Sequence, residues 1–222
     1  MSLNRNWWKY FLGLWMLLMI LGAFLYAPPA KGLGETGRIL FFHVPVAWLA
    51  TLAFLISAAA SLLYLRTPDK KYDIWASSAA QIGLIFAVLA TITGSIWAKK
   101  IWQSYWNWDP RETSIFILLL IYAAYFALRS AIEIDEQKAK LAAVYSLIAF
   151  VTVPFFIFIV PRVYESLHPD PLINPEGDIK MDSRMLEIFL GSLFAFTLLF
   201  YWLLRLKIEA INTKLLLDIL DK

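Results

Sequence analysis

Long apolar stretches alternate with short charged segments along this chain. A helix needs about 20 apolar residues to cross the hydrocarbon core of a bilayer, and tilt or snorkelling flanks accommodate somewhat shorter runs. The pattern predicts six spans, near residues 10–30, 39–65, 74–98, 113–128, 141–161 and 188–204. The expected fold is an all-α integral membrane protein, a six-transmembrane-helix bundle that forms one polytopic domain over residues 1–222.

The spacing of the spans also predicts an orientation. An even number of spans puts both termini on one side and residues 32–38, 99–112 and 162–187 on the other. Twelve of the twenty Lys and Arg residues fall on the terminal side and eight on the opposite side. Because Lys and Arg accumulate in cytoplasmic loops, we expect cytoplasmic termini and three outward loops. The first apolar stretch is interpreted as a span and not as a cleaved signal peptide.

Composition narrows the function classes. The chain is 60% hydrophobic, against about 45–50% in ordinary soluble domains. Its net charge of +3 is weak for a nucleic-acid binder, and the basic residues flank the apolar stretches, where they set orientation and meet lipid head groups. The chain has no cysteine, which excludes structural disulfides and mixed disulfides with a client protein.

Residues with cofactor chemistry collect on the outer side. His43 opens the second span, and His168 lies in the last outer loop; they are the only histidines. The middle loop and its flank hold four of the ten tryptophans within twelve residues, namely Trp97, Trp102, Trp106 and Trp108. Span parity alone brings these six side chains to one face of the membrane.

Each feature also has a purely structural interpretation. A histidine near a helix start is commonly a polar interfacial residue, and tryptophans commonly form interfacial belts. If residues 97–108 are helical, Trp97, Ile101, Tyr105 and Trp108 share one face, and the segment is an amphipathic anchor. The alternative is an aromatic platform for a ligand, and the segment by itself does not decide between the two.

The segment after the tryptophans reads as a helix start. Asp109 at N-cap, Pro110 at N1 and Glu112 at N3 form a pattern of the capping-box type. Arg111 then lies at the positive end of the helix, where the dipole gives a cation no stabilisation. Glu112 or a ligand carboxylate would supply the missing negative charge.

Taken together, the outer residues match the needs of haem. Aromatic faces suit a flat apolar ring, cations suit its propionates, and imidazoles suit axial ligation of iron. We expect His43 and His168 to ligate the iron of a non-covalently bound haem b. The candidate propionate partners are Arg38, Lys99, Lys100, Arg111 and Arg162.

Several segments resemble a known family. W-A-K-K-I-W-Q-S-Y-W-N-W-D-P-R-E-T-S resembles the tryptophan-rich WWD signature of haem-handling proteins. R-I-L-F-F-H-V-P-V-A-W and the L-H-P that follows V-P-F-F-I-F-I-V resemble the two outer histidine segments of the CcmC branch, and A-A-Q-I-G-L-I-F-A-V-L-A-T-I-T-G-S-I-W-A resembles its third span. The likeness covers roughly residues 36–171.

The resemblance implies haem binding over the loop 97–113 with both histidines as axial ligands. Trp97, Trp102, Trp106, Trp108 and Asp109 match the signature, and Arg38 and Arg111 match basic positions beside it. The branch delivers haem to a membrane-anchored haem chaperone during c-type cytochrome biogenesis. It acts with an ABC-type ATPase and its membrane subunit and with a small single-span partner. We therefore expect an inner-membrane protein that is not an enzyme.

One departure keeps an alternative open. D-P-R-E-T is closer to the form found in CcsA-type cytochrome c synthetases, which attach haem to apocytochrome c. An electron-transfer cytochrome b is disfavoured, because its histidines would lie within the bilayer, and a permease is disfavoured by the few charges at mid-depth. Residues 174–184 are expected to form a surface loop, and residues 207–222 an amphipathic helix or a docking tail.

Overall fold

The computed structural model describes residues 6–168 and 181–221. Six helices in it are long and apolar enough to cross a membrane, which confirms the predicted fold class. The elements are α1 (Trp7–Leu21), η2 (Gly22–Tyr26), η3 (Glu35–Ile39), α2 (Leu40–Arg66), α3 (Lys70–Trp102), α4 (Pro110–Ala131), α5 (Asp135–Pro154), η4 (Phe155–Ile159), α6 (Val160–Val163) and α7 (Ser183–Leu220). Most of the segment predicted as a surface loop, residues 174–180, lies outside the described residues.

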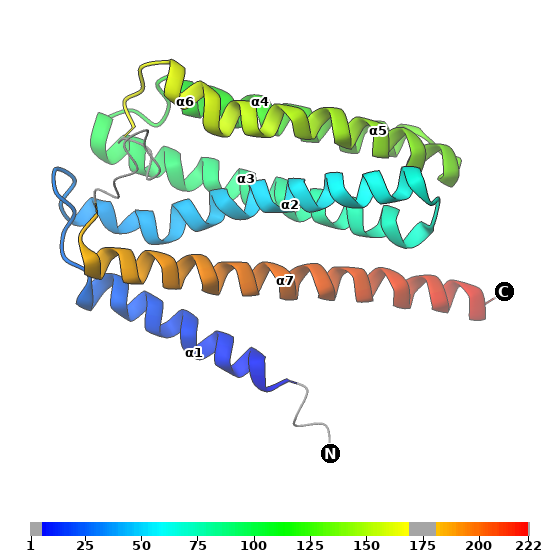
Figure 1. Cartoon of the computed structure of the whole chain (residues 1–222), viewed down its shortest axis with the longest axis horizontal. Coiled ribbons are helices and arrows are strands. Elements are labelled where there is room, and N and C mark those ends of the chain that lie inside the picture. Colours follow the sequence, from blue (N-terminus) through cyan, green and yellow to red (C-terminus); the bar gives the residue numbers. More distant parts are fainter. Residues whose placement is uncertain (1–5, 169–180, 222) are drawn as a thin grey trace.

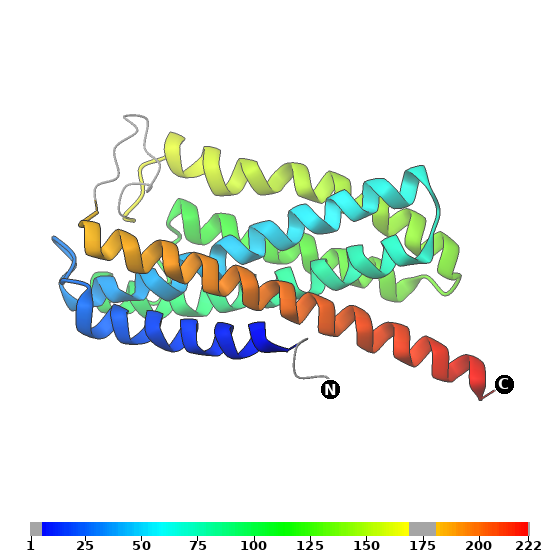
Figure 2. The same ribbon diagram turned by 60° about the horizontal axis from the view of Figure 1, so that its bottom comes forward.

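The helices differ from the predicted spans by several residues at their ends, and the C-terminal ends of the first and last helices have clear consequences. The first helix stops at Tyr26 because Ala27 is extended, as the following Pro28 favours. The last helix, α7, continues to Leu220 and has 38 residues, so it is about 57 Å long at 1.5 Å per residue. The C-terminal tail is therefore the continuation of the sixth helix, and Figures 1 and 2 show it extending past the other helices.

The helices α2 and α3 lie side by side at the centre of the bundle (Figure 1). Helices α4 and α5 cover one side of this pair, and α7 covers the other. Small residues allow the close approach: Gly83 of α3 faces Phe54 and Ala53 of α2 so tightly that a Cβ there would lie 2.7 Å from the Phe54 ring. Close packing of this kind associates helices in lipid, where apolar side chains gain nothing by leaving the solvent.

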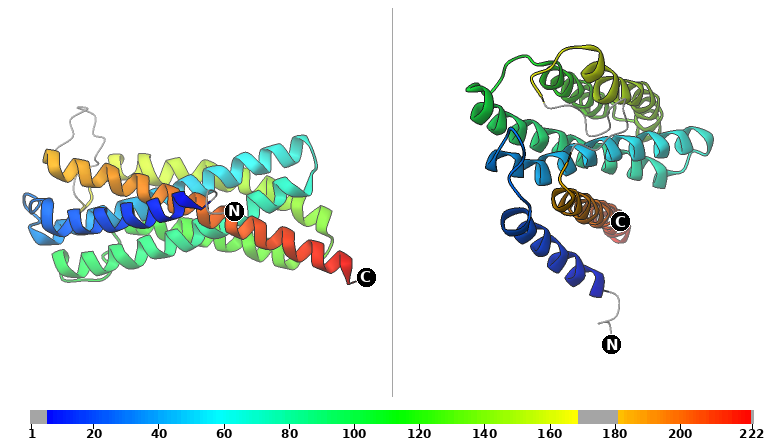
Figure 3. Two further views of the ribbon diagram at one scale, coloured as in Figure 1. Left: turned by 90° about the horizontal axis from the view of Figure 1, so that it is seen from below. Right: turned by 60° about the vertical axis from the view of Figure 1, so that its left-hand side comes forward.

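Helix α1 is the outermost element and packs on α7 (Figure 3). Its described contacts include a hydrogen bond from the Trp15 indole to the Gly191 carbonyl at 3.0 Å. Only 11% of the residues in its most apolar stretch are buried inside the protein. Most of its apolar surface is therefore left exposed by the rest of the protein.

The two ends of the bundle differ in chemistry. At one end Arg129 of α4 makes a two-pronged ion pair with Asp73 of α3, with N–O distances of 2.6 and 2.9 Å. At the other end lie the connections from α1 to α2 and from α3 to α4 and the chain after α6 (Figure 1). This second end holds both histidines and the tryptophan-rich segment, as span parity predicts.

Candidate functional site

The tryptophan-rich segment is only partly helical. Helix α3 ends at Trp102, and Gln103 adopts a left-handed conformation with φ 62°. The Lys99 ammonium donates a hydrogen bond to the Gln103 carbonyl at 2.9 Å and so closes the helix end. The condition for one amphipathic helix over residues 97–108 is therefore not met, and Trp97, which is 5% exposed, does not share a face with Trp108, which is 68% exposed.

The four tryptophans form two separate pairs. The Trp97 and Trp102 rings lie 6.1 Å apart, and those of Trp106 and Trp108 lie 5.8 Å apart. The second pair packs on Phe116 of α4, with ring separations of 6.1 and 6.4 Å. No ring contact joins the two pairs in the described part of the chain. The structure therefore holds two small aromatic clusters and not one continuous plate.

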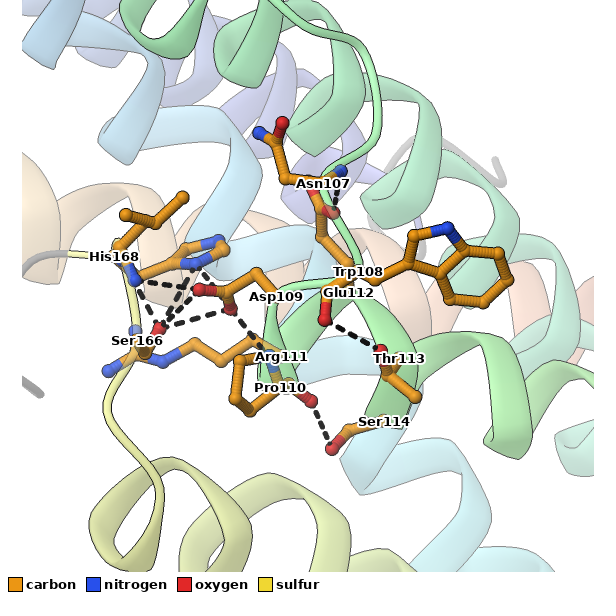
Figure 4. Close-up of polar contacts among 11 residues, drawn as sticks. Asn107, Trp108, Asp109, Pro110, Arg111, Glu112, Thr113, Ser114, Ser166 and His168 are labelled. Carbon is orange, nitrogen blue, oxygen red and sulfur yellow. Dashed lines mark hydrogen bonds and ion pairs between the residues drawn. The ribbon is translucent and has the colours of Figure 1, made fainter.

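Only the first pair adjoins a histidine. The His168 ring lies 4.8 Å from Trp102 and 6.3 Å from Trp97, edge-on to both. Trp108 has φ 58°, an unusual value for a bulky residue, and its indole points away from His168 in Figure 4. Contact between haem and Trp106 or Trp108 stays a prediction.

Asp109 is the polar centre of the site. Its carboxylate accepts the Arg111 N–H at 2.9 Å, which confirms the predicted N-cap of α4. The same carboxylate accepts the Ser166 hydroxyl at 2.9 Å and the Leu167 N–H at 2.7 Å. It also lies 3.0 Å from Nδ1 of His168 (Figure 4). One side chain thus starts α4 and holds the segment that carries His168.

These contacts fix the charge of Asp109. Burial by itself would raise its pKa, but hydrogen bonds from Arg111, Leu167 and Ser166 hold the pKa below its usual value. For His168, burial lowers the pKa, and the neighbouring Asp109 carboxylate partly offsets that effect. At neutral pH an ionised Asp109 therefore faces a neutral imidazole.

The protonated nitrogen of His168 follows from this pairing. An ionised carboxylate is only an acceptor, so Nδ1 of a neutral His168 carries the proton and donates it to Asp109. Within residues 6–168 and 181–221 no hydrogen bond reaches the other ring nitrogen, Nε2. The lone pair of Nε2 is therefore available to a metal ion. A ligating histidine commonly donates its second N–H to a carboxylate in this way.

His43 lies in the first turns of α2 and packs against α3. Its Nδ1 is 2.9 Å from the Thr93 hydroxyl. A Cβ added to Gly94 of α3 would lie 3.1 Å from Cε1 of His43, so the ring lies close to the α3 backbone. Thr93 and Trp97 are four residues apart, on one stripe of α3. Because Trp97 contacts His168, the two imidazoles lie along the same stripe.

The candidate cations have varied environments. Arg38 donates its Nη1 hydrogens to the carbonyls of Ala23 and Ala27, and its Nε to Glu35 at 2.6 Å. It thereby ties η3 to the end of the first helix, and a role toward a propionate stays a prediction. Arg111 points toward Ser166 in Figure 4, and its charge acts on His168.

Three other charged residues of the outer end make contacts within the protein. The Glu112 carboxylate is buried and accepts the Asn107 N–H at 2.7 Å, so Glu112 secures the turn before α4. The Lys99 ammonium lies 5.5 Å from the centre of the Tyr105 ring. Arg162 donates to the Phe158 carbonyl at 2.6 Å.

Three residues of the site escaped sequence reasoning: Thr93, Gly94 and Ser166. Threonine and glycine occur throughout membrane helices, so nothing in the local pattern marks Thr93 or Gly94. Ser166, in S-L-H-P, lies two residues before His168 and carries no distinctive signal of its own. Contacts across the fold reveal all three.

The donor set fits haem better than a bare metal ion. In the described ranges no group of three or more His, Cys, Asp or Glu side chains could hold a metal ion. Two imidazoles whose Nε2 atoms make no hydrogen bond with the described residues suit a metal whose remaining ligands come from a macrocycle. The Trp97 indole N–H is buried without a hydrogen-bond partner among the described residues, so a polar group of a ligand has a donor to meet there.

The sequence is similar to a known protein family over nearly its whole length. Residues 1–216 match the family described as heme exporter protein C. A heme exporter protein C from Bradyrhizobium diazoefficiens is 35% identical over 187 residues, covering 83% of this chain and 71% of that protein. A putative cytochrome c biosynthesis ccmC-like mitochondrial protein from Marchantia polymorpha is 32% identical, over 79% of this chain and 75% of its own. Heme exporter protein C of Escherichia coli K12 is 30% identical, with coverages of 79% and 70%.

Proposed function

Because this chain belongs to the heme exporter protein C family, we propose that it binds haem b non-covalently at the outer face of the cytoplasmic membrane and passes it on for c-type cytochrome biogenesis. One observation carries the proposal: the protein engages Nδ1 of each histidine, while no hydrogen bond from the described part of the chain reaches Nε2 of either. The names of the relatives, which refer to haem export and cytochrome c biosynthesis, agree with it.

Each residue of the site has a role in this proposal. His43 and His168 hold the iron through Nε2, and Asp109 orients His168. Trp97 and Trp102 cover the edge of His168 and offer apolar surface to the ring. Haem, when bound, would supply the iron that the two imidazoles hold.

The propionates need positive charge and hydrogen-bond donors. Arg111 is the best placed cation, because its charge already acts on His168. The indole N–H of Trp97 and the side-chain NH2 group of Asn107 are buried donors without a hydrogen-bond partner among the described residues. We expect these groups to meet the propionates.

Delivery completes the proposed function. The acceptor is a membrane-anchored haem chaperone, and the chain works with an ABC-type ATPase, its membrane subunit and a small single-span partner, without being an enzyme itself. The termini are cytoplasmic, and the site faces the periplasm or the outside.

The alternative, a synthetase that attaches haem to apocytochrome c, rested on D-P-R-E-T. The structure gives Pro110 the N1 position and gives Glu112 the turn before α4, so both have conformational roles that do not depend on a synthetase reaction. Co-expression with an apocytochrome that contains C-x-x-C-H, without any chaperone, separates the two readings. Covalent cytochrome formed in that setting would favour the synthetase.

The binding step is tested on protein purified in detergent and titrated with haem. The wild type is expected to give the Soret and visible bands of low-spin bis-imidazole iron. His43→Ala and His168→Ala are each expected to shift these bands, and the double variant, which contains no histidine, to lose them. Bands unchanged in the double variant would refute the proposal.

A further inference from the structure

The Thr93 hydroxyl has a defined direction in the helix. Its Oγ1 lies 2.8 Å from the Leu89 carbonyl and 3.2 Å from the Ala90 carbonyl. A hydroxyl carries one proton, and a threonine inside a helix commonly donates it to the carbonyl four residues earlier. The Thr93 hydroxyl therefore donates its hydrogen bond to the α3 backbone, and a lone pair of Oγ1 faces His43.

The tautomer of His43 follows from that lone pair. Nδ1 of His43 is 2.9 Å from Oγ1, and two acceptors do not form a hydrogen bond. Nδ1 must therefore be the protonated nitrogen. In a neutral ring, Nε2 is then unprotonated, which is the form that ligates a metal.

We propose that Thr93 is the positioning residue for His43: its hydroxyl oxygen accepts a hydrogen bond from the Nδ1–H of His43. This contact leaves Nε2 unprotonated and oriented toward the haem iron. This inference deepens the proposed function and rests on it. Gly94 supports the arrangement, because a Cβ there would lie 3.1 Å from Cε1 and 3.9 Å from Nε2 of His43 and would displace the ring.

The two axial positions are then unequal. The Nδ1–H of His168 meets the carboxylate of Asp109, and that of His43 meets a neutral hydroxyl. A hydrogen bond to an ionised acceptor is roughly twice as strong and raises the basicity of the ligand more. His43 is therefore the weaker ligand, and we infer that it is the one released first when haem is handed on.

The first test needs no haem. The chain has only two histidines, so [15N]histidine labelling gives two pairs of ring-nitrogen signals, which His168→Ala assigns. Protonated and unprotonated ring nitrogens differ strongly in chemical shift. We expect His43 to carry its proton on Nδ1 in the wild type and in Thr93→Ser, which keeps the hydroxyl, and to lose this preference in the near-isosteric Thr93→Val. A wild-type His43 protonated on Nε2 would overturn the inference.

The second test uses the haem-loaded protein. Thr93→Val is expected to weaken the His43–iron bond, seen as faster binding of CO to the ferrous protein and a changed low-spin EPR signal. Loss of such a partner typically costs about 10–100-fold in metal affinity, and we expect haem affinity to fall within that range. Thr93→Ser is expected to behave as the wild type.

The outcomes keep the two claims apart. If the wild type gives no bis-imidazole spectrum, the proposed function fails. If the wild type gives that spectrum and Thr93→Val matches both Thr93→Ser and the wild type in CO binding and EPR, the role of Thr93 fails and the proposed function stands. If the CO adduct of the [15N]histidine-labelled wild type keeps His43 and not His168 on the iron, the order of release fails.

Discussion

The carboxylate of Asp109 lies 3.0 Å from Nδ1 of His168, a residue 59 positions later in the chain. Because the same carboxylate caps α4, the start of a membrane helix and the orientation of a proposed iron ligand depend on one group. A substitution at Asp109 therefore has two separable effects, on the stability of α4 and on the site.

Asp109→Asn and Asp109→Ala separate these effects. Asn caps helices about as well as Asp, so Asp109→Asn is expected to keep the start of α4, although its amide nitrogen cannot accept the Leu167 N–H as the second carboxylate oxygen does. It loses the charge that orients His168, so its haem affinity is expected to fall by about 10–100-fold. Asp109→Ala is expected to lose in addition about 1 kcal/mol of stability. Haem titration and thermal unfolding measure the two quantities, and full haem affinity in Asp109→Asn would contradict the proposed role.

The two tryptophan pairs are expected to differ in function. Trp102 lies 4.8 Å from His168, whereas Trp108 is 68% exposed and packs near Phe116. We expect Trp102→Ala to weaken haem binding more than Trp108→Ala, with Trp102→Phe intermediate. Haem titrations of the three variants test this order. A larger loss in Trp108→Ala would mean that haem reaches the outer pair.

The ion pair between Arg129 and Asp73 is expected to stabilise the fold and not the site. Their side chains are 16% and 19% exposed, and removing one partner leaves a charge largely buried. Breaking such a pair costs about 3–5 kcal/mol, and we expect a loss near 3 kcal/mol in Arg129→Met because both groups keep some exposure. Unfolding in mixed detergent measures the loss.

Two controls sharpen this prediction. Arg129→Lys is expected to restore only part of the stability, because an ammonium does not reproduce the two-pronged contact. The double variant Asp73→Ala, Arg129→Met is expected to be more stable than Arg129→Met, because no buried charge remains. The haem spectrum of the folded fraction should be unchanged throughout; a spectral change would show that the two ends of the bundle are coupled.

The orientation of the bundle is open to direct measurement. The chain has no cysteine, so single cysteines report position without background. With the termini in the cytoplasm, an impermeant thiol reagent is expected to label Gln103→Cys on intact spheroplasts and to reach Ser130→Cys only after lysis. The reverse pattern would place the site on the cytoplasmic side.

Much of the fold is encoded in local sequence patterns. Six apolar stretches predicted the six helices, and Asp109-Pro110 predicted the start of α4, because hydrophobic length and N-cap chemistry are local properties. The end of α3 was not predictable in the same way. It depends on the left-handed conformation of Gln103, and no neighbouring glycine or proline in the sequence indicates that conformation.

The site was predictable in composition but not in arrangement. The two histidines and the tryptophans were recognisable as residue types with cofactor chemistry. The sorting of the tryptophans into two pairs depends on where α3 stops, and the contacts of Asp109 with residues 166–168 depend on packing between distant segments. The contact between His43 and Thr93 joins residues 50 positions apart on two neighbouring spans and leaves no trace in either local pattern.

The peripheral position of α1 has a consequence for how the protein can be dissected. The hydrogen bonds and ring contacts of His43 and His168 within the described residues come from α3, from the start of α4 and from Ser166, and none comes from α1. The remaining five helices thus contain a self-sufficient set of contacts around both imidazoles. The first helix is held by side chains such as Trp15 and by the carbonyls that accept from Arg38, and substitutions confined to its exposed face are expected to leave the chemistry at the outer end unchanged.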